Sequence, residues 1–280
     1  GGGLHGIDYS LPVASAQVKS ALLLAGLNAE GEMVVRESAP SRDHTERFLR
    51  WLGQPLTASD GCVRLTGARP WRGFDYCLPG DLSGAAFLLA AAALVQGSDV
   101  QVRGVGLNPS RAGILAALRS MGARLEAERW REEPGGEPMG DLRMRAGPLR
   151  AIEVGGASIP NLIDELPILA VLATQAEGQT VVRDAAELRV KESDRIASLA
   201  AGLRALGARF EATADGFVVE GPTPLRGTRV ESAGDHRIAM ALAVAGLIAE
   251  GETVIAGAEC VSKSFPGFAD SLRALGADVA

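Results

Sequence analysis

Five cationic side chains stand next to expected helix starts, and their placement is the clearest chemical signal in the sequence. They are Arg42, Lys191, Arg195, Arg237 and Lys263. A cation at a helix N-terminus opposes the helix dipole at a cost of up to ~1 kcal/mol, whereas a bound phosphate or carboxylate is stabilised there by both the dipole and the cation. The repeated placement therefore predicts binding of small anions. The alternative is that these cations are solvated or pair with Asp43, Glu192 and Asp235.

Short polar segments come directly before four apolar runs. They cover residues 15–17, 81–83, 161–164 and 235–237. Ser, Asp and Asn at these places are expected to cap helices by accepting unpaired backbone N–H groups. Capping is the simplest role for Asp164, which also supplies a carboxylate for acid–base chemistry. Glu192, directly after Lys191, is a second such carboxylate unless that pair is simply exposed.

Two interleaved sequence repeats predict the elements that position these residues. In the first repeat an Ala/Leu-rich helix ends in a glycine and continues into a strand, with the glycine at 31, 97, 178 and 251. In the second an amphipathic helix ends in a glycine before another strand, with the glycine at 53, 122, 207 and 276. Glycine after the last helical turn adopts the left-handed conformation that closes a helix, so we expect a positive φ there.

Each repeat predicts the order helix, strand, helix, strand, with further strand residues between, and four repeats cover the chain. The first helix is apolar on nearly every side and should be buried. The second carries charged residues on one face and should lie at the surface. The predicted fold class is α/β in compact domains. A solenoid is less favoured, because each repeat carries a different polar motif.

Composition excludes several classes of partner. Of 280 residues, 47% are apolar and only 4% are aromatic, which suits one or two domains of helices packed on sheets and not an aromatic platform for bases. The net charge of −6 argues against a nucleic-acid or anionic-membrane surface. The three cysteines are scattered and the histidines lack ligand spacing, so neither a disulfide framework nor a metal site is predicted. No apolar run is long enough to span a membrane, and together with the cysteine usage this predicts a cytoplasmic location.

Eight motifs occur in the order found in one enzyme family. They are VASAQVKSALLLAGL, SRDHTERFL, PGDLSGAAFLLAAA, NPSRAGIL, NLIDELPILAVLA, ELRVKESDRI, GDHRIAMALAVAGL and KSFPGF. ELRVKESDR and GDHRIAMA are the most specific of them. From about Leu11 to its end, the chain resembles the 5-enolpyruvylshikimate-3-phosphate synthases.

The resemblance implies an enolpyruvyl transferase fold of two domains, each with three βαβαββ units whose helix N-termini face the cleft between the domains. Four of the six units are expected here, with residues 1–75 as the last unit of the first domain and residues 76–280 as the second domain. The family's opening phosphate-binding segment, with its lysine, has no counterpart, because Pro79–Ala86 resembles only its second-domain echo and lacks the lysine. On this basis the chain alone is expected to be an incomplete enzyme.

The resemblance also implies a reaction. The family transfers the enolpyruvyl group of phosphoenolpyruvate to the 5-hydroxyl of shikimate 3-phosphate and releases phosphate, a transferase step of the shikimate pathway for aromatic amino-acid biosynthesis. Addition and then elimination proceed through a tetrahedral ketal phosphate. No metal and no organic cofactor is expected, the two metabolites are the expected partners, and the family implies a monomer.

Catalytic roles follow from the matched motifs as expectations. Asp164 is similar to the carboxylate that orients the 5-hydroxyl and takes its proton, and Glu192 resembles the acid that protonates the methylene carbon. Lys191 resembles a residue that shares this proton transfer and contacts the substrate. For Glu192 to act as an acid near neutral pH, burial and substrate charge must raise its proton affinity.

Substrate-binding residues are implied in the same way. Shikimate 3-phosphate is expected at Ser15, Ala16, Gln17, Arg42, Asp164 and Lys191. Phosphoenolpyruvate is expected at Gln17, Arg195, Arg237 and Lys263. Planar guanidinium groups suit carboxylate and phosphate oxygens. Asp235 and His236 are expected to support the arginines and to stabilise charge.

Two alternatives remain open at this stage. A UDP-N-acetylglucosamine enolpyruvyl transferase shares the fold and the chemistry, although RDHTE, KESDR and GDHRIAM fit the shikimate branch better. The other alternative is a non-catalytic anion-binding fragment that keeps the repeats without turnover.

Overall fold

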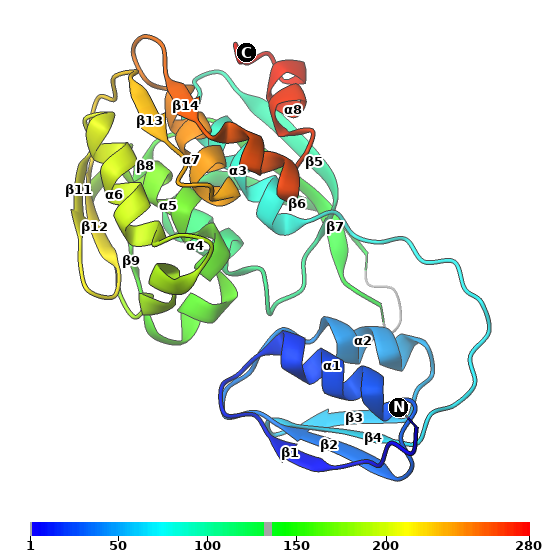
Figure 1. Cartoon of the computed structure of the whole chain (residues 1–280). Coiled ribbons are helices and arrows are strands. Elements are labelled where there is room, and N and C mark those ends of the chain that lie inside the picture. Colours follow the sequence, from blue (N-terminus) through cyan, green and yellow to red (C-terminus); the bar gives the residue numbers. More distant parts are fainter. Residues whose placement is uncertain (1, 132–135) are drawn as a thin grey trace. The chain divides into compact units, whose positions relative to one another are not determined.

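The computed structural model describes residues 2–131 and 136–280. The chain divides into two compact units, each described here by itself (Figure 1). Unit 1 comprises Gly1–Pro79, Gly106–Arg111 and Trp130–Met139; unit 2 comprises Gly80–Val105, Ala112–Arg129 and Gly140–Ala280. The division into 1–75 and 76–280 stays a proposal. The two units differ from it in that residues 76–79, 106–111 and 130–139 belong to unit 1.

Unit 1 is a four-stranded sheet with two helices in the order βαβαββ. Its elements are β1 (Asp8–Ser10), α1 (Ala16–Gly26), β2 (Glu32–Arg36), α2 (His44–Trp51), β3 (Leu56–Ser59) and β4 (Cys62–Thr66). The strand order is β1-β2-β4-β3, in which β1 and β2 are parallel and the other neighbours are antiparallel. A parallel pair requires a crossover, and α1 supplies it.

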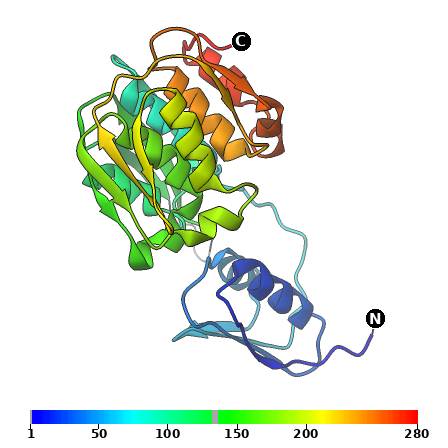
Figure 2. The same cartoon turned by 60° about the vertical axis from the view of Figure 1, so that its left-hand side comes forward.

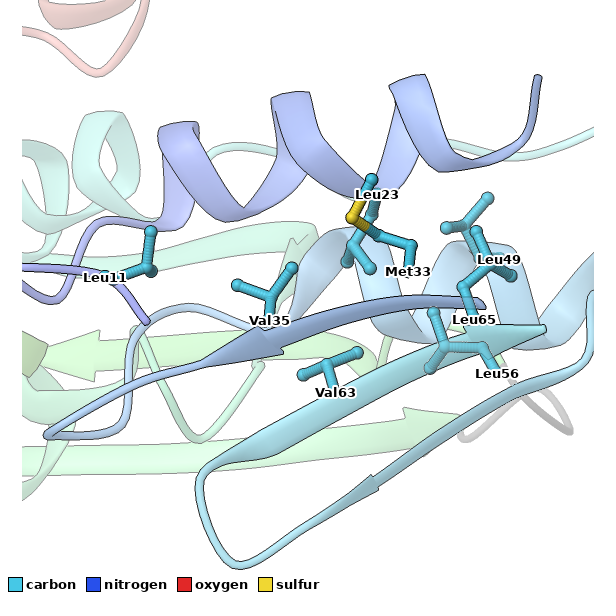
Figure 3. Close-up of a cluster of buried hydrophobic side chains, with 8 residues drawn as sticks. All are labelled: Leu11, Leu23, Met33, Val35, Leu49, Leu56, Val63 and Leu65. Atoms are coloured by element: carbon cyan, nitrogen blue, oxygen red, sulfur yellow. The ribbon is translucent and has the colours of Figure 1, made fainter. Parts of the chain in front are cut away.

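The core of unit 1 lies between its helices and one face of the sheet, as Figure 3 shows. Met33 and Val35 alternate along β2 so that both point to the helices, as a two-residue strand period requires. Leu23 of α1 and Leu49 of α2 meet them, and both leucines are at most 1% exposed. This small core fixes α1 and α2 on the same face of the sheet.

Helix α1 departs from the expectation that the first helix of each repeat is buried. Val18 and Leu24 on its outer side are 44% and 52% exposed, so that prediction is wrong for α1. An apolar helix is buried all round only where neighbours cover every side, and in unit 1 the sheet lies on one side of α1.

Unit 2 holds most of the remaining elements. Its helices are α3 (Leu82–Leu94), α4 (Gly113–Ser120), α5 (Leu166–Ala173), α6 (Arg195–Ala205), α7 (His236–Gly246) and α8 (Phe268–Ala274). The strands after unit 1 are β5 (Asp99–Gly106), β6 (Arg124–Arg131), β7 (Met139–Arg145), β8 (Leu149–Arg150), β9 (Glu153–Val154), β10 (Ala176–Val182), β11 (Arg209–Ala212), β12 (Phe217–Gly221), β13 (Arg229–Glu231) and β14 (Val254–Ala256). Short 3₁₀ helices are η1 (Gly156–Asn161), η2 (Ile163–Glu165), η3 (Ala186–Val190) and η4 (Ala258–Lys263).

The sheets show that the repeat seen in unit 1 recurs. The order β8-β10-β12-β11, with β8 parallel to β10 and the other pairs antiparallel, matches β1-β2-β4-β3. Strands β5, β7 and β6 form a second sheet, and β13 pairs in parallel with β14. The predicted α/β fold with repeated βαβαββ units is confirmed.

Three apolar helices form the centre of unit 2. Helices α3, α5 and α7 contact one another, and Figures 1 and 2 show them inside the unit. Every residue of α5 is buried, so the expectation of burial is confirmed for these three helices. Although they are apolar, no described helix is both long and apolar enough to cross a membrane.

Helix ends follow the predicted glycine pattern. Gly53, Gly122, Gly207 and Gly276 directly follow the C-cap residues of α2, α4, α6 and α8, with φ between 74° and 96°. The first-repeat pattern is less regular, because Gly178 lies inside β10 and not at a helix end. The second helix of each repeat is therefore closed as the sequence indicates.

Candidate active site

The polar residues singled out in unit 2 lie at the starts of neighbouring helices. Asp164 lies in η2, directly ahead of α5, and Arg195 is the first residue of α6. Asp235 is the N-cap of α7, and its carboxylate accepts the backbone N–H of Arg237 at 2.9 Å. Because α5, α6 and α7 contact one another, their starting segments bring these side chains together.

Arg195 is the centre of this group. Its side chain is 1% exposed, and its Nε donates to Asp235 Oδ2 at 2.8 Å. Its Nη1 lies 3.5 Å from Asp164 Oδ1, and its Nη2 lies 2.5 Å from Glu192 Oε2. Arg195 therefore pairs with nearby acids, as the alternative interpretation expected. The same contacts also bring the polar side chains of three helix starts together, as the anion-binding interpretation expected.

Two ionisation shifts follow from this packing. Burial alone raises the pKa of Asp235, but the hydrogen bond and the charge of Arg195 outweigh burial and hold that pKa below its ordinary value of 3.8. Burial lowers the pKa of His236 below 6.5, and the neighbouring charge of Arg237 adds to this effect. At neutral pH Asp235 is therefore ionised and His236 is neutral, which fits support of the arginines and not a cationic role for the imidazole.

Arg237 reaches Asp164 from a second direction. Its Nη1 donates to the backbone carbonyl of Asp164 at 3.0 Å, and its Nη2 lies 3.8 Å from Asp164 Oδ2. Asp164 thus stands between two guanidinium groups with 13% of its side chain exposed. Its expected capping role is wrong, because the N-cap of α5 is Glu165 and no side chain caps that helix.

Sequence reasoning missed two further members of the group. Glu165, whose side chain is 1% exposed, places its Oε1 3.7 Å from Arg237 Nη1. Ser83 in the first turn of α3 donates its hydroxyl to the same Oε1 at 2.5 Å. The adjacent acids in NLIDELP were the available signal, but sequence alone does not show which of two neighbouring carboxylates turns inward.

Lys191 and Glu192 precede α6 and are less enclosed than the arginines. The side chain of Lys191 pairs with Glu187 and is 25% exposed, and that of Glu192 is 50% exposed. Burial was one of the two expected causes of a raised proton affinity at Glu192, and this half-exposed position does not provide it.

Lys263 occupies a different position from the one expected. It ends η4, whereas α8 begins only at Phe268, so its expected place at a helix start is wrong. The 3₁₀ helix packs against α7, and the Lys263 side chain is exposed. Among the described residues, no hydrogen bond or ion pair joins Lys263 to the group around Arg195.

The unit 1 candidates lie at the starts of α1 and α2. Ser15 is the N-cap of α1, and its Oγ accepts the N–H of Val18 at 3.4 Å. The N–H groups of Ala16 and Gln17 belong to the first turn, which has no intrahelical acceptors. Arg42 lies two residues before α2 begins. These groups are donors suited to a phosphate.

The arrangement in unit 2 supports acid–base and anion chemistry. A carboxylate such as that of Asp164 can accept a proton from an alcohol, and guanidinium groups such as those of Arg195 and Arg237 are of the type that binds a carboxylate or phosphate. In the part of the chain that the structure describes, no group of three or more His, Cys, Asp or Glu side chains is placed to hold a metal ion.

Comparison with known proteins identifies a family. A model of the EPSP synthase (3-phosphoshikimate 1-carboxyvinyltransferase) family matches residues 1–272. The 3-phosphoshikimate 1-carboxyvinyltransferase of Desulforamulus reducens is 52% identical over 273 residues, covering 98% of this chain and 63% of the relative. That of Pelotomaculum thermopropionicum is 55% identical, covering 97% and 63%. The chain thus spans 63% of the length of these curated relatives.

Solved structures agree with this result. An EPSP synthase from Acinetobacter baumannii superimposes with a TM-score of 0.93 at 44% identity, covering 98% of this chain and 63% of that one. The enolpyruvyl transferase NikO from Streptomyces tendae superimposes with a TM-score of 0.74 at 24% identity, covering 91% and 58%. The second similarity concerns the fold alone.

Proposed function

Because this chain belongs to the EPSP synthase (3-phosphoshikimate 1-carboxyvinyltransferase) family, we propose that its protein transfers the enolpyruvyl group of phosphoenolpyruvate to the 5-hydroxyl of shikimate 3-phosphate. Phosphate is the second product. The single observation that carries the proposal is Asp164 held between Arg195 and Arg237. Joining an alcohol to a donor that carries both a carboxylate and a phosphate requires a base for the hydroxyl proton and cations for the two anionic groups, and this arrangement brings both together.

In the proposed addition step, Asp164 takes the proton of the 5-hydroxyl as the oxygen attacks C2 of phosphoenolpyruvate. Glu192, with Lys191 beside it, delivers a proton to the methylene carbon, so a methyl group forms. The product of this step is the tetrahedral ketal phosphate. In the elimination step the methyl carbon returns a proton, the C2–O bond to phosphate breaks, and the enol ether and inorganic phosphate leave.

The arginines supply the electrostatic part of the proposal. Arg195 and Arg237, with Lys263, bind the carboxylate and phosphate of phosphoenolpyruvate, and Gln17 contacts the same substrate. Asp235 fixes Arg195 through a buried ion pair, and this preorganisation avoids reorganisation during the reaction. His236, neutral at pH 7, leaves the local charge to the arginines.

Shikimate 3-phosphate is assigned to the unit 1 candidates and to Asp164 and Lys191. The α1 N-terminus with Ser15, Ala16 and Gln17 binds phosphate oxygens through backbone and hydroxyl donors. Arg42 adds a guanidinium to them. No metal or organic cofactor, a monomer, a cytoplasmic location and the absence of nucleic-acid or membrane partners remain predictions from the sequence and the family.

Calorimetry with shikimate 3-phosphate, alone and with phosphoenolpyruvate, tests the proposal, together with a phosphate-release assay. We expect binding of shikimate 3-phosphate and tighter binding of phosphoenolpyruvate in its presence. Arg237→Met should weaken phosphoenolpyruvate binding about 10- to 100-fold, since hydrogen bonds to charged groups contribute about 1.5–3 kcal/mol. Arg229→Met, at an arginine 69% exposed, is the matched control.

Each negative outcome has a distinct meaning. Absence of binding of both metabolites contradicts the proposal. In a chain extended to the length of the curated relatives, binding without phosphate release assigns the protein to the anion-binding alternative; for the present chain alone, binding without release is the expected result. Equal loss in both arginine variants removes Arg237 from the phosphoenolpyruvate site.

A further inference from the structure

Three ionisable side chains that the proposed reaction does not use lie buried together in unit 1. Lys19 of α1 is 1% exposed, and its Nζ lies 2.8 Å from Glu37 Oε2 and 2.7 Å from Glu46 Oε1. The side chains of Glu37 and Glu46 are only 5% and 3% exposed. We call Lys19, Glu37 and Glu46 the buried charge cluster. Well-packed apolar residues are often as stabilising as buried ions, so stability alone is a weak reason for such a cluster.

The cluster is also incompletely satisfied. One ammonium group faces two carboxylates, and Glu46 Oε2 is buried with no hydrogen-bond partner among the described residues. Glu37 Oε1 accepts a hydrogen bond from Ser41. A network that served only to stabilise the unit is expected to leave no buried oxygen without a donor.

The cluster joins the two segments that carry the unit 1 candidates. Lys19 follows Ser15, Ala16 and Gln17 within the first turns of α1, and Glu46 lies in the first turn of α2. A second link connects the same turns, because the hydroxyls of Ser20 and Thr45 lie 2.6 Å apart. Arg42 therefore lies in sequence between two anchored residues. Ser41 donates a hydrogen bond to Glu37, and the hydroxyl of Thr45 contacts that of Ser20 in α1.

Lysine usage sets this position apart. Of the 28 lysines and arginines in the chain, only Lys19, Lys191 and Lys263 are lysines. The other two are candidate substrate-binding residues, and elsewhere the chain uses arginine as its cation. An ammonium group is compact and directs its three donors freely, so two carboxylates from different elements can enclose it where a planar guanidinium does not fit.

We propose that the buried charge cluster positions the α1 N-terminus against the Arg42 segment, so that both present their donors to one phosphate group. Lys19 is a positioning residue and does not touch the substrate. This inference rests on the proposed function, because the phosphate is that of shikimate 3-phosphate.

The test compares neutral replacements of a buried and an exposed ion pair in the same unit. Lys19→Met alone leaves two buried carboxylates without a cation, so the test variant is Lys19→Met/Glu37→Gln/Glu46→Gln, which is uncharged and similar in volume. The matched control is Arg64→Met/Glu32→Gln, which removes a pair with side chains 44% and 41% exposed. Thr45→Val is a second test variant, isosteric and uncharged, that breaks only the link to Ser20.

Three readouts separate positioning from stability. Calorimetry with shikimate 3-phosphate and with inorganic phosphate gives affinity. Tryptophan fluorescence in urea gives the stability of unit 1, because all three tryptophans lie in that unit. Backbone amide shifts of residues 15–17 and 42–45 report the positions of the two segments without any ligand.

We expect the triple variant to bind both ligands at least about tenfold more weakly and Thr45→Val to bind them about threefold more weakly. The affinity of the control variant should not change, and the unfolding midpoint of Thr45→Val should stay close to that of wild type. Displaced amide shifts at 15–17 and 42–45 should accompany the loss. Affinity within twofold of wild type in both test variants overturns the inference and leaves the proposed function standing. If wild type itself binds neither ligand, the proposed phosphate contact fails, and unchanged amide shifts in both variants then overturn the positioning role as well.

Discussion

Replacing Asp235 by Asn tests how much the buried Arg195–Asp235 pair holds the helix starts of unit 2 together. The substitution keeps size and capping ability, since Asn also caps helices, but removes the charge that faces an arginine 1% exposed. Breaking a buried pair by neutralising one partner typically costs 3–5 kcal/mol. Asp164 and Glu192 remain beside Arg195 at 3.5 and 2.5 Å, so we expect the low end, about 3 kcal/mol.

The assay is thermal unfolding followed by circular dichroism at pH 7. For a unit of this size, each kcal/mol shifts Tm by roughly 2–4 °C, so Asp235→Asn should lower Tm by about 6–12 °C. Asp194→Asn is the matched control, because Asp194 also caps a helix and pairs with an arginine, Arg189, but its side chain is 38% exposed. Exposed pairs contribute at most about 1 kcal/mol. Equal Tm losses in the two variants would refute the reasoning.

The same variant has a pH signature. The pKa of Asp235 is lowered in the folded protein, so its stabilising effect is fully present above the unfolded value, about 3.9, and is lost as pH falls through the folded pKa. The Tm difference between wild type and Asp235→Asn should therefore persist from pH 7 to pH 5 and shrink below about pH 4. A difference that grows on acidification contradicts the ion-pair account.

Four further outcomes follow from the structure. The pKa of His236 is lowered by burial and then by Arg237, so below about pH 6.5 the unfolded chain binds a proton that the folded protein does not, and the fold loses stability. His236→Asn should therefore reduce the fall in Tm between pH 7 and pH 5. Leu23→Ala, at a residue fully buried in the unit 1 core, should cost about 2–5 kcal/mol in urea unfolding followed by tryptophan fluorescence. Gly207→Ala, at φ 96°, should cost about 1–2 kcal/mol in the circular-dichroism transition. Glu192→Gln, in a chain extended to the length of the curated relatives, should lower turnover about 10²- to 10⁴-fold while shikimate 3-phosphate affinity stays within twofold.

Contradicting results are defined for three of these variants. An unchanged pH profile in His236→Asn contradicts the neutral, buried histidine. A fluorescence midpoint unaffected by Leu23→Ala contradicts the placement of the unit 1 core, and Ala21→Gly on the exposed side of α1 gives the helix-propensity baseline. Full turnover in Glu192→Gln removes that residue from the acid role.

Local features of the fold were predictable because they depend on short-range physics. The spacing of glycines predicted where α2, α4, α6 and α8 end, because the left-handed backbone conformation that follows a helix is adopted most easily by glycine in any surroundings. Apolar residues on nearly every side predicted that helices α3, α5 and α7 are buried. Burial of α1 was not predictable, because exposure of Leu24 depends on which elements pack on the helix and not on the helix itself.

The candidate site was predictable in its residue types and less so in its geometry. The motifs placed Asp164, Arg195 and Arg237 at helix starts, and the structure brings them together. The inward turn of Glu165, the half-exposure of Glu192 and the 3₁₀ position of Lys263 depend on side-chain packing and on the local path of the chain. Neither is encoded in the spacing of the motifs.

A crystal structure of the protein with phosphoenolpyruvate and shikimate 3-phosphate tests the central claim most directly. The account predicts carboxylate or phosphate oxygens of phosphoenolpyruvate within hydrogen-bond distance of Arg195 and Arg237, and the shikimate 5-hydroxyl within that distance of Asp164. Phosphoenolpyruvate bound elsewhere, with both arginines still held by their carboxylate partners, would contradict it.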